Sequence, residues 1–144
     1  MKLIIDSRMR EEEKRYINKY GEIIEINPKL DVYEEISGHP DIFICKINDK
    51  VILSPNLRED NYINIENCEY GEEYLEKKYP SDIKYNICQI GNNVVHDFRY
   101  TDERVIETIN KYNLNKIQVK QGYSNCSISV ISENACITSD KRNL

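Results

Sequence analysis

The chain has 144 residues, a size typical of one domain with a hydrophobic core, and carries a formal net charge of −5. Hydrophobic residues make up 40% of it and charged residues 31%, a balance that excludes a disordered tail and predicts a globular fold. Acidic and basic residues are interspersed without a basic block, so we expect neither nucleic acid nor a membrane surface as partner. The N-terminus has no signal-peptide pattern, and we expect a cytoplasmic protein.

The N-terminal segment predicts a strand, a helix and a second strand. Residues 2–6 (KLIID) are rich in β-formers, and Ser7 is a candidate cap for the helix that follows. Gly21 ends this helix, and residues 22–26 (EIIEI) then predict a strand.

Three later segments share one pattern, in which two β-rich runs flank a short polar connection. Connections rich in Asn, Asp and Gly are typical of tight hairpins with one residue at positive φ. Ile47, Ile90 and Ile131 are equivalent in this pattern and recur at intervals of roughly 40 residues, which corresponds to one supersecondary unit per repeat. The segments are DIFICKI-NDK-VILS, KYNICQI-GNN-VVHD and NCSISVI-SEN-ACIT.

The connection after the first hairpin predicts a mixture of short elements. Residues 57–60 favour a helical turn, and residues 62–66 (YINIE) favour a strand. Residues 71–79 (GEEYLEKKY) favour a helix that ends before a proline.

The connection after the second hairpin predicts a helix and a strand. Thr101 is the candidate cap of a helix that continues to residue 112, and residues 117–120 (IQVK) predict the strand. No Pro/Gly-rich linker divides the chain, so we expect a single domain. Its predicted units are roughly 1–56, 57–98 and 99–144.

This order of elements resembles the pentein fold of guanidino-group-modifying enzymes, which include deiminases and amidinotransferases. The run Gly38-His39-Pro40-Asp41 is similar to the His-x-Asp at the mouth of a strand in those enzymes. Nearly all of the chain resembles an uncharacterised bacterial family assigned to the same fold. The matching segments are GHPDI (38–42), KYPSDIKYN (78–86) and VKQGYSNCSISVISENACITSD (119–140).

The resemblance implies an α/β fold, a partial pentein-like β/α propeller of about three ββαβ units. Penteins close a ring of five units, and members of the resembling family continue beyond the equivalent of Asp140. The nucleophilic cysteine of the characterised pentein enzymes usually lies in the last unit, so the resemblance implies that the equivalent position is missing from this chain.

The resemblance offers three catalytic candidates, His39, Asp41 and Cys126. Guanidine hydrolysis needs a thiolate, a proton shuttle and a carboxylate that holds the planar cation; these roles fit Cys126, His39 and Asp41 respectively. On an extended strand His39 and Asp41 would share one face, and Pro40 disfavours a helical His39. The alternative is a loop histidine, an acid at a strand start and a small core thiol.

Asp6, Asp82 and Asp140 lie near the ends of predicted strands and are candidate substrate-binding carboxylates, although turn formation also explains acids at such positions. His96 and Asp97 are neighbours that face opposite ways on a strand, so we do not expect a catalytic dyad.

The five cysteines predict free thiols, because they form no CxxC or CxxH pair and fit no zinc spacing. Cys45 and Cys88 occupy equivalent hairpin positions, which favours packing in the core, and Cys136 is also interpreted as structural. No phosphate loop or dinucleotide fingerprint is present, so no cofactor or metal is expected.

The favoured function is a non-catalytic, small-ligand-binding relative of the guanidino-group-modifying enzymes. One alternative is a cysteine-dependent hydrolase or deiminase of a guanidino or amidine compound. Another is a structural subunit that completes a barrel by self-association. Three units leave an open sheet edge, from which we expect a homodimer.

Overall fold

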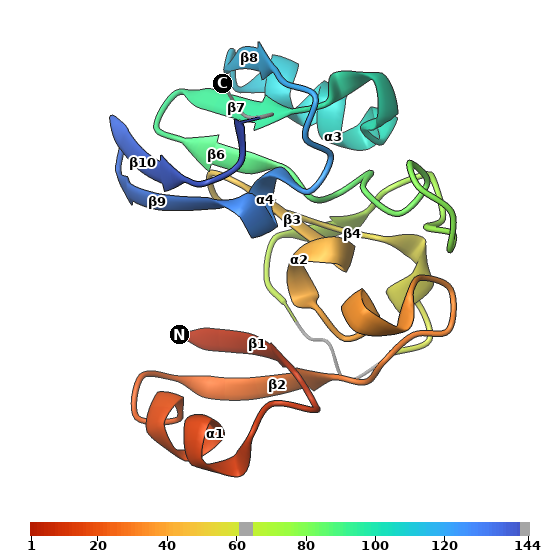
Figure 1. Ribbon diagram of the computed structural model, residues 1–144, viewed down its shortest axis with the longest axis vertical. Helices are drawn as coiled ribbons and strands as arrows, with labels where there is room; N and C mark the ends of the chain where they lie inside the picture. The colour runs from red at the N-terminus through yellow and green to blue at the C-terminus, as the bar shows by residue number, and fades with distance from the viewer. Residues whose placement is uncertain (61–64, 142–144) are drawn as a thin grey trace.

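The computed structural model describes residues 1–60 and 65–141. Within them the strands form small separate sheets, helices and turns connect the sheets, and no barrel closes (Figure 1). This confirms a mixed α/β fold. The sheet orders are β1-β2, β3-β4-β5, β6-β7-β8 and β10-β9.

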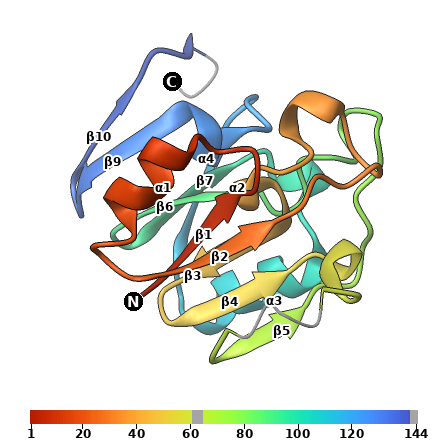
Figure 2. The ribbon, with the colours of Figure 1, turned by 90° about the horizontal axis from the view of Figure 1, so that it is seen from below.

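The N-terminal pair of strands is as predicted. β1 (Lys2–Asp6) and β2 (Glu22–Ile26) run parallel, and α1 (Glu11–Ile17) connects them (Figure 2). The prediction that Ser7 caps this helix is wrong, because α1 begins after Arg10. The Asp6 carboxylate accepts hydrogen bonds from Arg8, including its backbone N–H at 2.8 Å, and this turn delays the helix.

The first hairpin joins β3 (Ile44–Ile47) to β4 (Lys50–Leu53), and β5 (Cys68–Tyr70) pairs parallel with β4. Asn48 takes the positive φ, 52°, that the turn pattern predicts. The sheet therefore runs past the expected unit boundary at residue 56. Most of the strand predicted at 62–66 lies outside the described residues. The short helical elements nearby are η1 (Glu34–Ile36), α2 (Pro40–Phe43) and η2 (Pro55–Leu57).

The second hairpin repeats this arrangement. β6 (Cys88–Ile90) pairs antiparallel with β7 (Asn93–His96), and β8 (Asn115–Gln118) pairs parallel with β7. The predicted order of hairpin, helix and strand is confirmed here, although β8 begins two residues before the predicted strand. The connecting helices are η3 (Phe98–Tyr100) and α3 (Glu103–Lys111).

The third hairpin consists of β9 (Ile128–Ser132) and β10 (Ala135–Thr138), preceded by α4 (Ser124–Ser127). Gly91, at the turn of the second hairpin, has φ of +55° and approaches the third: a Cβ there would collide with the Glu133 carbonyl oxygen. The two hairpin tips are therefore in close contact.

The helix predicted at residues 71–79 is wrong, because this segment is an irregular loop that binds a buried carboxylate. The backbone N–H groups of Glu72 and Glu73 donate to Asp102 Oδ2 at 2.9 and 2.8 Å. The Tyr85 hydroxyl lies 2.9 Å from the same oxygen. The N–H groups of Glu72 and Glu73 thus find their acceptor in a side chain and do not need a helical turn.

Asp102 also caps α3 in place of the predicted Thr101. Its Oδ1 accepts the Arg104 N–H at 2.9 Å, which satisfies one free donor at the helix start. A fully buried acid thus serves both the loop and the helix.

A continuous apolar core extends from β2 to α3. The interpretation of Cys45 and Cys88 as core residues is confirmed, because both are buried. The core cluster comprises Ile24, Ile26, Val32, Ile42, Phe43, Cys45, Ile47, Ile52, Leu53, Leu57, Leu75, Tyr85, Ile87, Val94, Val105 and Ile109. No helix among residues 1–60 and 65–141 combines the length and apolarity needed to span a membrane.

His96 is buried at the end of β7, and no residue in the described ranges hydrogen-bonds to either of its ring nitrogens. Its ring packs edge-on against Phe98, with centroids 6.2 Å apart. Burial therefore lowers the pKa of His96 to about 4.

We predict that His96 makes the fold acid-sensitive. Between the usual histidine pKa of about 6.5 and about 4, the unfolded chain binds a proton that the native chain excludes. As the pH falls through this window, the free energy of unfolding of the wild type should decrease by about 3 kcal/mol more than that of His96→Leu. Urea unfolding at several pH values measures it, with exposed His39→Ala as the matched control. Parallel profiles for wild type and His96→Leu would contradict the prediction.

Candidate functional site

The segment around Asp41 is a short helix and not a strand. Pro40 occupies its first turn, where proline fits, and His39 stays extended with φ −71° and ψ 116°. The expectation that His39 and Asp41 share a strand face is therefore wrong, because the strand begins only at Ile44. Asp41 lies half-buried in the first turn of α2.

Cys126 lies on α4, which precedes the third hairpin as α2 precedes the first. α4 ends at Ser127, immediately before β9, just as α2 ends immediately before β3. The Ser127 hydroxyl donates to the Tyr123 carbonyl at 2.8 Å and closes this turn. Cys126 is exposed as a residue.

The structure brings Asp41 and Cys126 together, 85 residues apart in the sequence. The Cys126 thiol donates to Asp41 Oδ2, with 2.8 Å between sulfur and oxygen. α2 and α4 thus contribute one side chain each to a thiol–carboxylate pair at the starts of two hairpins.

Asn86 holds this pair from the second unit. Its Nδ2 donates to the Cys126 sulfur at 3.1 Å and to the Asp41 carbonyl at 2.9 Å. Its Oδ1 accepts the N–H groups of Asn125 at 2.9 Å and Cys126 at 3.3 Å. Asn86 is fully buried, and these contacts use all four hydrogen-bonding positions of its carboxamide.

The environment of Cys126 favours the neutral thiol. Loss of hydration against the neighbouring elements, followed by the negative charge of Asp41, raises the pKa of Cys126 to about 12. The bond from Asn86 to the sulfur opposes this shift but does not reverse it. At neutral pH Cys126 is therefore a hydrogen-bond donor and not a thiolate.

His39 forms no hydrogen bond with the side chains of this pair in the part of the chain that the structure describes. None of the residues in the described ranges hydrogen-bonds to its exposed imidazole, and Gly38 packs directly against the Asp6 carboxylate. Hydrogen bonds from Arg8, with a minor contribution from His39, lower the pKa of Asp6. Asp6 is already paired with Arg8 at 2.7 Å, so its carboxylate belongs to the N-terminal turn.

Asp82 and Asp140 belong to a network that supports α4. The Tyr123 hydroxyl donates to Asp82 Oδ2 at 2.6 Å. Gln121 donates to Asp140 through its side-chain N–H and accepts the Tyr123 N–H at 2.9 Å. Burial raises the pKa of Asp82, whose Oδ1 accepts no hydrogen bond in the described part of the chain.

Two residues of the site, Asn86 and Tyr123, were not predicted from the sequence. The signal for Asn86 is its place in the repeat. It immediately precedes Ile87, as Phe43 precedes Ile44, so a polar residue occupies a position that is apolar in the first unit. Such an exchange at a buried position indicates a specific hydrogen-bonding role.

The remaining thiols are free, and the interpretation of Cys136 as structural is wrong because it is exposed on β10. His96 and Asp97 do not form a dyad: Asp97 is paired with Arg99 at 2.6 Å. Within residues 1–60 and 65–141, no three His, Cys, Asp or Glu side chains gather as metal ligands.

Comparison with known protein families matches nearly the whole chain. Residues 4–143 match a family of unknown function, DUF6873. No match was found among the curated proteins or among the solved structures.

We predict that Asp41→Asn increases the reactivity of Cys126. The substitution removes the negative charge that raises the thiol pKa, so more thiolate should be present at each pH. Because burial remains the larger cause, the pKa should stay above that of an ordinary cysteine. Iodoacetamide alkylation between pH 7 and 10, followed by peptide mass spectrometry, measures the rate. Exposed Cys136 is the internal control, and an unchanged Cys126 rate would show that Asp41 does not act on the thiol.

Proposed function

The chain belongs to the DUF6873 family, whose function is unknown, and we propose that it binds a small guanidino or amidine cation without converting it. The observation that carries this proposal is the Asp41–Cys126 pair, in which a half-buried carboxylate meets an exposed thiol. We further propose that the ββαβ units belong to a partial pentein-like propeller. The two three-stranded sheets support this, because in each of them an antiparallel hairpin is followed by a parallel third strand.

The chemistry of Asp41 suits a planar cation. Oδ2 accepts the thiol, whereas Oδ1 accepts no hydrogen bond from the described residues. A guanidinium or amidinium group presents parallel N–H donors that match the two oxygens of a carboxylate. Such a ligand would compete with the thiol for Oδ2 and bind Oδ1 at the same time.

Two features favour binding over catalysis. A thiol with a pKa of about 12 supplies very little thiolate at neutral pH. His39, the expected proton shuttle, forms no hydrogen bond with Cys126 in the described part of the chain. Neither the nucleophile nor its base is therefore prepared for reaction.

A cysteine-dependent hydrolase is the second candidate, and the 2.8 Å contact favours it. A bound cation would lower the thiol pKa by its charge, and Asp41 is placed to accept the proton. This route needs no histidine in contact with the thiol.

We predict that guanidinium, agmatine or L-arginine binds near Asp41. Titration of ¹⁵N-labelled protein should shift amides of α2, α4 and Asn86, and Asp41→Asn should weaken binding about tenfold or more. Exposed Asp31→Asn is the matched control and should bind as wild type. Equal affinity for all three proteins would place the ligand elsewhere.

A chloro-amidine probe separates binding from catalysis. The binding proposal expects no selective labelling of Cys126 at neutral pH, in wild type or in His39→Ala. Rapid, selective labelling of Cys126 together with turnover of the guanidino compound would establish the hydrolase instead.

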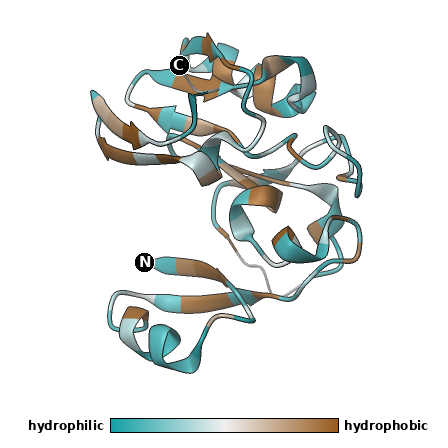
Figure 3. Ribbon diagram, in the orientation of Figure 1, coloured by the Kyte–Doolittle hydropathy of each residue, from teal (hydrophilic) through white to brown (hydrophobic). Residues whose placement is uncertain are grey.

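We also propose that the protein self-associates through the third hairpin. Val130, Ile131 and Ile137 are exposed at 47%, 63% and 66%, and Figure 3 shows the hydrophobic colouring along β9 and β10. In the described chain β10 pairs only with β9, whereas β4 and β7 each have a third, parallel strand beside them. Exposed apolar side chains beside a free strand edge favour pairing with another chain.

We predict a concentration-dependent dimer that Ile131→Glu disrupts, because burying the new charge would oppose association. Sedimentation velocity between about 5 and 500 μM, a range that spans a micromolar dissociation constant, measures it. Ile117→Glu, at an exposed position on β8, is the matched control. A monomer at every concentration would refute the proposal.

A further inference from the structure

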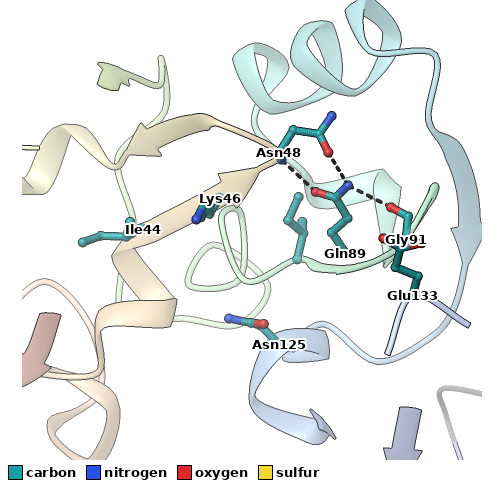
Figure 4. A pocket seen from close by; sticks show the side chains of 8 residues that line it. Ile44, Lys46, Asn48, Gln89, Gly91, Asn125 and Glu133 are labelled. Atoms are coloured by element: carbon teal, nitrogen blue, oxygen red, sulfur yellow. Dashed lines mark hydrogen bonds between the residues drawn. The ribbon is translucent and has the colours of Figure 1, made fainter. Parts of the chain in front are cut away.

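A polar groove of about 450 Å³ lies between the first two hairpins and the turn of the third (Figure 4). Its volume is in the range of small-molecule sites. Ile44 and Lys46 of β3 face it, as does Gln89 of β6, because residues two apart on a strand share a face. The lining residues are Ile44, Lys46, Asn48, Ile87, Gln89, Gly91, Asn125 and Glu133.

The first and second hairpins form two walls of this groove, and hydrogen bonds fix them relative to each other. Gln89 Nε2 donates to Asn48 Oδ1 at 2.7 Å and to the Gly91 carbonyl at 2.9 Å. Gln89 Oε1 accepts the Asn48 N–H at 2.9 Å, and Figure 4 shows these bonds. Both polar ends of Gln89 are therefore engaged, and the two hairpin turns are held together.

The third wall is held by close packing. Glycine at position 91 allows the Glu133 backbone to approach the second turn, where a Cβ would collide with it. The walls thus keep their separation without a ligand, and a preorganised site loses less free energy to ordering when it binds.

Two opposite charges line the groove without pairing. Lys46 on β3 and Glu133 in the third hairpin turn form no ion pair or side-chain hydrogen bond within residues 1–60 and 65–141. Other charged residues in those ranges do pair, as Lys50 does with Glu69 on the neighbouring strands. Lys46 and Glu133 therefore remain available to an external ligand of matching charges.

We propose that this groove binds a small zwitterion, an amino carboxylate whose carboxylate meets Lys46 and whose ammonium meets Glu133. Charge-assisted hydrogen bonds at both ends fix its orientation. The Asn125 carboxamide, which lines the same groove, offers a donor and an acceptor to the ligand. The few apolar groups lie at Ile44 and Ile87, so the site suits a polar ligand with a short hydrocarbon chain.

A series of amino carboxylates of increasing length tests the proposal. Glycine, 3-aminopropanoate, 4-aminobutanoate and 6-aminohexanoate are titrated into ¹⁵N-labelled protein, with acetate and methylammonium as singly charged controls. We expect one chain length to bind best, in the millimolar range, because the hairpins that carry Lys46 and Glu133 are held together at their turns. The shifted amides should lie in β3, β6 and the third hairpin turn.

Matched variants identify the charges responsible. Lys46→Gln and Glu133→Gln should each weaken binding of the preferred zwitterion by about tenfold or more, whereas Lys116→Gln on β8 should leave it unchanged. Equal binding of all chain lengths, equal shifts with acetate alone, or wild-type affinity in both groove variants would overturn the proposal. Guanidinium and agmatine carry no carboxylate and therefore probe Asp41 separately, so failure in the groove leaves that test intact.

Discussion

The candidate site depends on one buried carboxamide, that of Asn86. It lies between α2 and α4 and bonds to the backbone of both and to the Cys126 sulfur. A buried polar group is stable only when its hydrogen bonds are satisfied, so this residue requires both helices in their observed places. The thiol–carboxylate contact is a consequence of that requirement.

The repeat explains why these three positions meet. α2 and α4 immediately precede β3 and β9, and Asn86 lies two residues before β6. The segments that precede the three hairpins thus converge, although the residues that meet are not at identical repeat positions, since Asn86 corresponds to Phe43 and not to Asp41. The first unit contributes an acid, the second an amide and the third a thiol. The segments before the three hairpins of the described chain can therefore build an asymmetric site from dissimilar residues.

Periodicity and turn chemistry predicted the N-terminal strands and the three hairpins, because alternation and Asn or Gly at the turns are local properties, but they missed β5, whose pairing with β4 is a contact distant in the sequence. The loop at 71–79 was mispredicted because its amides bind Asp102, a contact across 29 residues that no local pattern contains. The same limit applies to the site. Asp41 and Cys126 were identified through a resemblance, whereas Asn86, whose role rests wholly on contacts with other units, was not.

The neutral state of Cys126 bears on which ligands the site can accept. A protonated thiol already occupies Asp41 Oδ2, so a ligand must replace that bond with a stronger one. Neutral donors offer little advantage over the thiol, whereas a cation adds charge to the hydrogen bond and roughly doubles its strength. The same cation would reduce the repulsion that keeps the thiol protonated. Ligand selection and thiol reactivity are therefore coupled through one carboxylate.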